Sequence, residues 1–372
     1  MKAIIVGGGI MGLSTAWALA REGHAVELFE QGPLPNPLAS SVDEHRLIRH
    51  PYGDHRGYAA MIDPAYAAWN LMWQDLGRRY HAATGTLALT GNGADWAARS
   101  AAHLAAIGRP MTELTIPELV RRFPLLDAKG VERAFWIDTG GELFAQDIVL
   151  ALARHLEKRP GVRLRAGTLI RSVDLEHGHV STASDTHAAD LVIVAAGAWT
   201  NRLLPRLASR LTPSRQIVAY FELPPDQRAA WAQAPMIIEK TGDVGLYLVP
   251  PAEGRRLKVG DHEFSGRGDP DAPREATAKE IKPLLERCRG LLHGFDRWRI
   301  DQLKACFYTV TADERFVVEK QGACGWVMSP CSGHGFKFGA IMGLELARTI
   351  GGSRSPEAHA KWAAGELADS GG

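Results

Sequence analysis

Cysteine is scarce in this chain, with four residues among 372, all of them in the last quarter of the sequence. They form no CxxC pair, and no cysteine and histidine cluster has the spacing of a zinc site. This argues against a disulfide scaffold and a metal site, and it favours a reducing cytoplasm. Cys306 lies within a strand-like run, where burial as a small hydrophobic residue is the default expectation.

An excess of charge of either sign is also missing. The chain has 43 basic and 42 acidic residues, a formal net charge of +1, and no block of lysine and arginine. Neither a nucleic acid nor an anionic membrane is therefore expected as a partner. No repeat with a period of about 20 to 50 residues occurs, which argues against solenoids and propellers.

Residues 3–20 are uncharged, follow Lys2 and end in Ala-Leu-Ala, as a secretory signal could. Three glycines would make a poor signal core, and the segment is short for a bilayer span. The same region carries a dinucleotide-binding pattern instead. The apolar run 2–6 predicts a buried parallel strand, 13–21 a helix, and 25–30 a second strand. We favour the nucleotide-binding interpretation over export.

Between the first strand and the helix, GGGIMG matches the GxGxxG fingerprint. Gly7 would permit the tight turn, Gly9 the approach of a pyrophosphate, and Gly12 close packing of helix and strand. The helix N-terminus would meet the phosphate charge. Glu30, 18 residues after Gly12, would accept hydrogen bonds from ribose hydroxyls.

The fingerprint alone does not separate NAD from FAD, because both present an ADP group. Residues 189–199 (ADLVIVAAGAW) predict another buried strand that ends in a turn of small residues. This segment resembles the strand that, in flavoproteins of the glutathione reductase type, returns the chain to the same sheet beside the cofactor. An ordinary core strand is the alternative.

Helical and strand patterns alternate along the rest of the chain. The predicted helices are 58–79, 95–107, 116–122 and 146–158, and the predicted strands are 85–89, 162–166, 172–176, 179–182, 216–222, 245–249, 256–260 and 305–311. We predict an α/β fold with two domains. The dinucleotide-binding domain would comprise 1–84, 144–212 and 312–372, and a second, α+β domain on a mostly antiparallel sheet would comprise 85–143 and 213–311.

Residues 329–338 (SPCSGHGFKF) precede an amphipathic run at 339–350. The Gly333-His-Gly335 turn would open a helix with unpaired N–H groups and a positive dipole end. Such an end suits the negative charge that a flavin gains on accepting a hydride. Lys337 is predicted in the first helical turn, where a cation is unfavourable and therefore suggests function. An exposed lysine that points away is the alternative.

Six segments occur in an order that resembles the monomeric sarcosine oxidase and N-methyltryptophan oxidase family, within the D-amino acid oxidase superfamily. They are GGGIMG, HRLIRHPYG (45–53), GLYLVP (245–250), LKVGDH (257–262), CFYTVT (306–311) and SGHGFKF (332–338). The last two are the most specific, and the similarity spans nearly the whole chain. It implies a glutathione-reductase-type FAD-binding domain, a substrate domain and a monomeric protein.

The resemblance assigns Cys306 to a covalent bond with the 8α-methyl of FAD. The attack needs a thiolate, which Lys304 on the same strand face and Arg46 would favour. A buried core thiol is the alternative. The resemblance also implies that Arg49 and Lys337 bind the substrate carboxylate, since arginine offers a bidentate fork and lysine a point charge.

Further implied roles concern the flavin and the substrate cavity. Arg46 would lie beside the flavin, and Tyr247 and His262 would line the cavity. Lys258 would lie over the flavin, where a positive charge stabilises superoxide, and it would share a strand face with His262. Taken singly, such arginines and lysines are more often solvated surface charges.

The chain departs from the family where a segment of the type SHGxTR is usual. Here 40–46 is SSVDEHR, so that Val42 replaces a histidine, Asp43 a glycine and His45 a threonine. These positions would face the flavin, so the substrate and the loop path stay open, whereas the carboxylate pair is unaffected.

We therefore expect an FAD-dependent amine oxidase that converts a secondary amino acid to an imine and reduces dioxygen to hydrogen peroxide. Sarcosine, larger N-methyl amino acids and cyclic imino acids all fit a carboxylate clamp beside a flavin. Two alternatives stay open: a dehydrogenase of the same fold that passes electrons to a carrier or quinone, and a flavin-binding subunit without turnover of its own.

Overall fold

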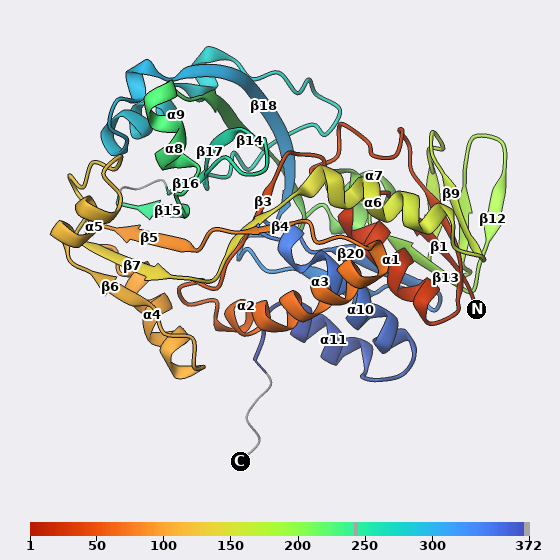
Figure 1. Cartoon of the computed structure of the whole chain (residues 1–372). Helices are drawn as coiled ribbons and strands as arrows, with labels where there is room; N and C mark the ends of the chain where they lie inside the picture. The colour runs from red at the N-terminus through yellow and green to blue at the C-terminus, as the bar shows by residue number, and fades with distance from the viewer. Residues whose placement is uncertain (92, 242–244, 368–372) are drawn as a thin grey trace.

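The computed structural model describes residues 1–91, 93–241 and 245–367 (Figure 1). A six-stranded sheet organises one side of the molecule, at the right of Figure 1. Its strands, in spatial order, are β19 (Val317–Lys320), β20 (Gly325–Ser329), β13 (Leu191–Val194), β1 (Lys2–Val6), β2 (Ala25–Phe29) and β9 (Val162–Arg165). All neighbours are parallel except β19 and β20, which are antiparallel.

Both faces of this sheet are buried, as expected for parallel strands. Alternate side chains of β1 pack on opposite sides, with Ile5 on the side of the helices and Ile4 on the other. The helices of the first side are α1 (Ile10–Arg21), α3 (Ile62–Leu76), α6 (Ala145–Glu157) and α10 (Gly339–Ile350). The other face is covered by a small antiparallel sheet of β10 (Ser172–Asp174), β11 (His179–Ser181) and β12 (Thr186–Ala188).

A second, eight-stranded sheet lies at the left of Figure 1. Its order is β18 (Arg299–Val310), β14 (Thr212–Glu222), β17 (Leu257–Asp261), β16 (Leu246–Val249), β15 (Met236–Lys240), β5 (Thr86–Thr90), β7 (Arg133–Ile137) and β6 (Thr112–Leu114). The sheet is antiparallel except between β15 and β5. Leu257 and Val259 pack into a core with α5 (Ile116–Arg122), α8 (Pro225–Trp231) and α9 (Ala278–Leu291). The alternate residue Lys258 therefore faces the opposite side.

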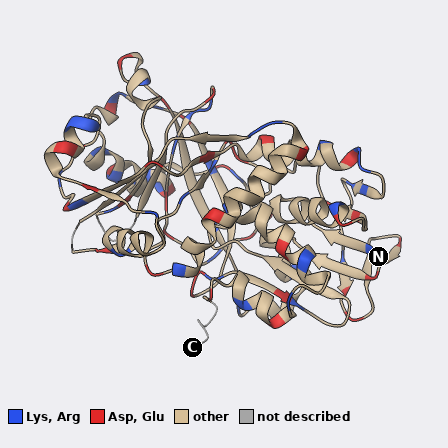
Figure 2. Cartoon of the chain, turned by 60° about the horizontal axis from the view of Figure 1, so that its bottom comes forward, with Lys and Arg blue, Asp and Glu red and all other residues tan. Residues whose placement is uncertain are grey.

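Short elements connect the parts of the molecule that are built on the two large sheets. A three-stranded sheet joins β3 (Arg46–Ile48), β8 (Gly141–Leu143) and β4 (His81–Ala83). The remaining helices are α2 (Arg56–Ala60), α4 (Trp96–Ala106), α7 (Thr200–Leu203) and α11 (Pro356–Ala363). Basic and acidic residues are interspersed over the elements (Figure 2). In the parts of the chain that the structure describes, no helix is long and apolar enough to cross a membrane.

Several predicted elements differ in extent. The predicted helix 58–79 is two helices, α2 and α3, and α3 ends at Leu76 because Gly77 takes a left-handed conformation. The strand-rich block 211–311 also contains α9, which the sequence prediction missed. The sequence contains a signal for the start of this helix, because Thr277 and Glu280 form a capping box. Helix α5 has the predicted bounds.

Candidate functional site

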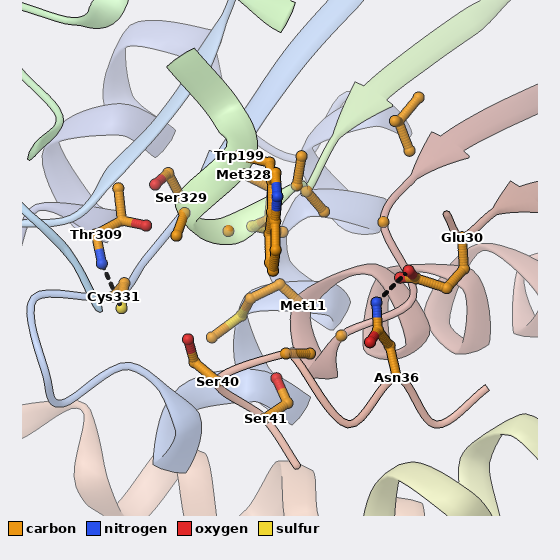
Figure 3. Close-up of a pocket in the computed structure, with 18 of the residues that line it drawn as sticks. Met11, Glu30, Asn36, Ser40, Ser41, Trp199, Thr309, Met328, Ser329 and Cys331 are labelled. Atoms are coloured by element: carbon orange, nitrogen blue, oxygen red, sulfur yellow. Dashed lines mark hydrogen bonds between the residues drawn. The ribbon is translucent and has the colours of Figure 1, made fainter. Parts of the chain in front are cut away.

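Two cavities lie between the two large sheets and share a boundary. The first, of about 430 Å³, runs along the glycine turn and the turn that follows β13 (Figure 3). The second, of about 220 Å³, extends under the eight-stranded sheet. Both are lined by Arg46, Tyr308, Gly333 and Phe336, so these residues mark the junction.

The glycine turn brings the N-terminus of α1 against the first cavity. Gly7 has a φ of 114°, and a Cβ on it would lie 2.4 Å from the carbonyl oxygen of Ala195. A Cβ on Gly12 would lie 1.9 Å from the carbonyl oxygen of Gly7. Gly9 lines the cavity, and Ser41 Oγ accepts a hydrogen bond from the N–H of Ile10 at 3.0 Å. Only glycine fits the two crowded positions, and the backbone stays open toward the cavity.

Glu30 lies at the opposite end of the first cavity from Cys331 (Figure 3). Its buried carboxylate accepts hydrogen bonds from Gly8 N at 2.8 Å, Gly32 N at 2.9 Å and Asn36 Nδ2 at 2.8 Å. A carboxylate has about four acceptor sites, so room for a further donor such as a hydroxyl remains. This end of the cavity, together with the glycine turn, fits the ADP part of a dinucleotide.

The turn that contains Gly333 and Gly335 lies at the junction of the two cavities. Gly333 has a φ of 75°, and a Cβ on Gly335 would lie 1.8 Å from the carbonyl oxygen of Pro330. The prediction for Lys337 was wrong in one respect: it lies in a 3-10 turn, Phe336–Phe338, that precedes α10. Its side chain is not exposed. It is buried, and its Nζ donates to the carbonyl oxygen of His334 at 2.9 Å.

Arg49 and Lys337 are brought together around Tyr52 in the second cavity. The Arg49 guanidinium carbon lies 4.4 Å from the Tyr52 ring centre, and Lys337 Nζ lies 5.5 Å from it. Arg49 Nη1 is buried and has no hydrogen-bond partner among the described residues. Burial first, and then Arg49, lowers the pKa of Lys337 well below its ordinary value. An entering carboxylate would pair with Arg49 and favour the charged form of Lys337.

Asp43, one of the positions that depart from the family, contacts two of the predicted site residues. Its buried carboxylate accepts from Lys258 Nζ at 2.6 Å, and it also contacts Arg46 and the hydroxyl of Tyr220. Burial, and then Arg46, lowers the pKa of Lys258, whereas the adjacent carboxylate favours the charged lysine. A buried acid thus holds both cations beside the junction.

Val42 and His45, the other two positions that depart from the family, hold the loop of residues 40–46 in place. His45 is buried, and its Nε2 lies 2.9 Å from the carbonyl oxygen of Arg256. Burial lowers the pKa of His45 to about 3, so the ring is neutral. The carbonyl oxygen of Val42 accepts from Lys304 Nζ at 2.7 Å. The loop that carries Asp43 is therefore tied to both β17 and β18.

Tyr247 and His262 line the second cavity, as does Glu314, which the sequence analysis did not select. His262 Nε2 lies 3.2 Å from Glu314 Oε2. This contact lowers the pKa of Glu314 and keeps it ionised. Lys240 and Trp96 were also missed. They come from distant segments, and no local pattern marks them.

Cys306 is buried on β18, in a small cluster with Tyr308 and Val310 against which Phe264 and Cys331 pack. Tyr308, on the same strand face, lines both cavities, and Cys331 lines the first. Lys304 also shares this face. Burial, and then Arg46, lowers the pKa of Lys304 to about 8, while Cys306 acts in the opposite direction. Lys304 is thus a cation near the Cys306 thiol, and Cys306 itself is on the lining of neither cavity.

Known proteins resemble this chain over almost its full length. The family model described as FAD dependent oxidoreductase (DAO) matches residues 2–349. Monomeric sarcosine oxidase of Bacillus sp. (strain NS-129) is 27% identical over 358 residues, which cover 93% of this chain and 91% of the relative. N-methyl-L-tryptophan oxidase of Yersinia pestis (strain Pestoides F) is 23% identical, over 91% of this chain and 92% of the relative.

The solved structure of NikD, described as an unusual amino acid oxidase essential for nikkomycin biosynthesis, has the same fold. It superposes with a TM-score of 0.81 at 21% identity, over 96% of each chain. This match confirms the predicted fold class. The first cavity also has what FAD needs: a glycine cradle at a helix N-terminus, an acid at the end of β2, and an opening toward a polar second cavity.

Proposed function

Because this chain belongs to the DAO family of FAD-dependent oxidoreductases, we propose that it oxidises a secondary amino acid, N-methylated or cyclic, at its C–N bond. The names of the sarcosine and N-methyltryptophan oxidases support this substrate class. The observation that carries the proposal is a pair of cations, Arg49 with its buried Nη1 and the buried Lys337, in a cavity that opens onto the cofactor cavity.

In this proposal, Arg49 and Lys337 bind the substrate carboxylate and so fix the carbon next to nitrogen at the junction. Tyr247 and His262 line the space for the rest of the substrate. A hydride leaves that carbon of the neutral amine, and water hydrolyses the resulting imine. Bound FAD supplies the two-electron acceptor, and dioxygen takes up two electrons and two protons to give hydrogen peroxide.

The cofactor contacts are part of the same proposal. Gly7, Gly9, Gly12 and Glu30 would hold the ADP part, and Gly333 and Gly335 would present N–H groups to the flavin. Arg46 and Lys258 would place positive charge at the flavin, where it stabilises superoxide. We also retain the two-domain division, a monomeric state and a cytoplasmic location as proposals.

Replacing Lys337 by alanine tests the carboxylate site. We expect kcat/KM for N-methylglycine to fall about tenfold to a hundredfold, because a charge-assisted contact is lost at a buried position. The measurement is steady-state peroxide production, with Lys361→Ala as an exposed control. An unchanged kcat/KM in the Lys337 variant, with flavin content equal to that of the parent, would refute the assignment.

A second prediction concerns the proposed thioether between Cys306 and FAD. After acid precipitation, yellow colour should stay in the washed pellet of the parent protein and of Cys331→Ser, and leave the pellet of Cys306→Ser. Cys331 is the matched control because it lines the first cavity and packs against the cluster that contains Cys306. Colour in the supernatant of the parent protein would show a flavin held without a tether.

One observation favours a second candidate, the same-fold dehydrogenase. The Asp43 carboxylate lies 2.6 Å from Lys258 Nζ, so its negative charge offsets the field that would stabilise superoxide. Reoxidation of the substrate-reduced protein in air-saturated buffer separates the two. Rapid return of the oxidised flavin spectrum supports an oxidase, whereas slow return with rapid dye reduction supports a dehydrogenase.

A further inference from the structure

The second cavity holds three cations that lack an acidic partner among the described residues: Arg49, Lys337 and Lys240. We call these three cations the row, because two aromatic rings connect them. Arg49 and Lys337 both lie near the Tyr52 ring, at the distances given above. The Trp96 ring lies 5.5 Å from the Arg49 guanidinium carbon and 5.0 Å from Lys240 Nζ. The row thus extends beyond the pair assigned to one carboxylate.

The acidic residues that line this cavity do not neutralise the positive charge of the row. Asp54 is exposed and pairs with Arg99 at 3.1 Å, and Glu239 is buried and pairs with Arg287 at 2.6 Å. Only Glu314 acts on the row, because its charge favours the ionised forms of both Arg49 and Lys240. Burial, and then Arg49, lowers the pKa of Lys240 against this effect. With all three cations charged and Glu314 ionised, the row and Glu314 together carry a charge of +2.

A substrate with one carboxylate and a neutral amine would leave an uncompensated positive charge in this cavity. Two carboxylates would balance it. On the basis of the proposed function, we propose that the substrate is a secondary amino acid with a second carboxylate. Lys240 binds this second carboxylate beside the Trp96 ring. Arg49 and Lys337 keep the α-carboxylate, and Trp96 sets the distance between the two anionic ends.

The test compares acids with their isosteric amides. N-methyl-L-glutamate is measured against N-methyl-L-glutamine, and N-methyl-L-aspartate against N-methyl-L-asparagine, as kcat/KM of the holoenzyme. We expect one acid to exceed its amide about tenfold to a hundredfold, the range for contacts between charged groups. The ratio should fall to near one in Lys240→Met. It should persist in Lys279→Met, an exposed lysine on α9.

Binding without turnover separates this proposal from the oxidation itself. Glutarate and butyrate are titrated into the holoenzyme and measured by calorimetry, in the parent and in Lys240→Met. Tighter binding of glutarate that depends on Lys240 supports the second carboxylate site, even if no amine reduces the flavin. Equal acid and amide rates in both pairs, together with equal binding of glutarate and butyrate, would overturn it, even if N-methylglycine is oxidised.

Discussion

The Gly12→Ala variant is expected to purify without flavin. A Cβ at this position would lie 1.9 Å from the carbonyl oxygen of Gly7 and 3.0 Å from its carbonyl carbon. Both atoms are backbone, so relief requires a shift of the glycine turn or of α1. Helix α1 cannot move freely because it packs on α10, where a Cβ on Gly343 would lie 2.5 Å from the carbonyl oxygen of Ser14.

The strain falls on the turn that would hold the pyrophosphate. Overpacking of this kind costs about 1–3 kcal/mol or more. The measurements are the ratio of flavin to protein absorbance after purification and the melting temperature of the apoprotein. Gly290→Ala is the control, since a Cβ there meets no atom within 4 Å and alanine favours the helix. Full flavin content in Gly12→Ala would show that close packing at this glycine is not required.

Replacing Asp43 by asparagine should cause the largest loss of stability among single polar changes in the site. Asp43 is 3% exposed and contacts Lys258, Arg46 and Tyr220. The amide keeps the shape but leaves two cations beside the junction without an acid. Removing one partner from a buried ion pair costs about 3–5 kcal/mol. The measurement is the free energy of unfolding of the apoprotein in urea, where flavin loss does not contribute.

A double-mutant cycle separates the effect of the unpaired charge on stability from the other effects of the substitution. Adding Lys258→Met to Asp43→Asn should recover part of the loss, because two neutral groups replace a buried pair at lower cost than one unpaired charge. Asp226→Asn removes an acid from an exposed pair with Arg297, and we expect little change there. Equal stability of the parent and Asp43→Asn would mean that the carboxylate does not hold these cations.

The elements that could be predicted are those with a local signal. The strand, glycine turn and helix of residues 2–21 follow from apolar runs and from glycine spacing, and both act within a few residues. Helix α5 starts at a Thr115 cap with Glu118 and ends as predicted. Helix α9 had the same kind of cap, but its charged face and Pro283 obscured the apolar periodicity.

The second cavity could be predicted only in part. Motif resemblance selected Arg49, Tyr247, His262 and Lys337, and the structure places all four on its lining. It did not select Trp96, Lys240 or Glu314. Those residues belong to α4, β15 and the turn after β18. They meet because the eight-stranded sheet contains both β15 and β18 and α4 packs on its strands β5 and β7.

The sequence by itself determined the dinucleotide-binding unit and the family, and it led to the selection of Arg49 and Lys337 as the proposed carboxylate site. These depend on glycine spacing, hydrophobic periodicity and residue order, all of which can be read directly from the sequence. Tertiary structure decided the environment of each charge. It buried Lys337, placed Asp43 against Lys258 and brought Lys240 to the same aromatic ring as Arg49. The energy of a charge depends on its burial and its distance from other charges, and both are set by contacts between distant segments.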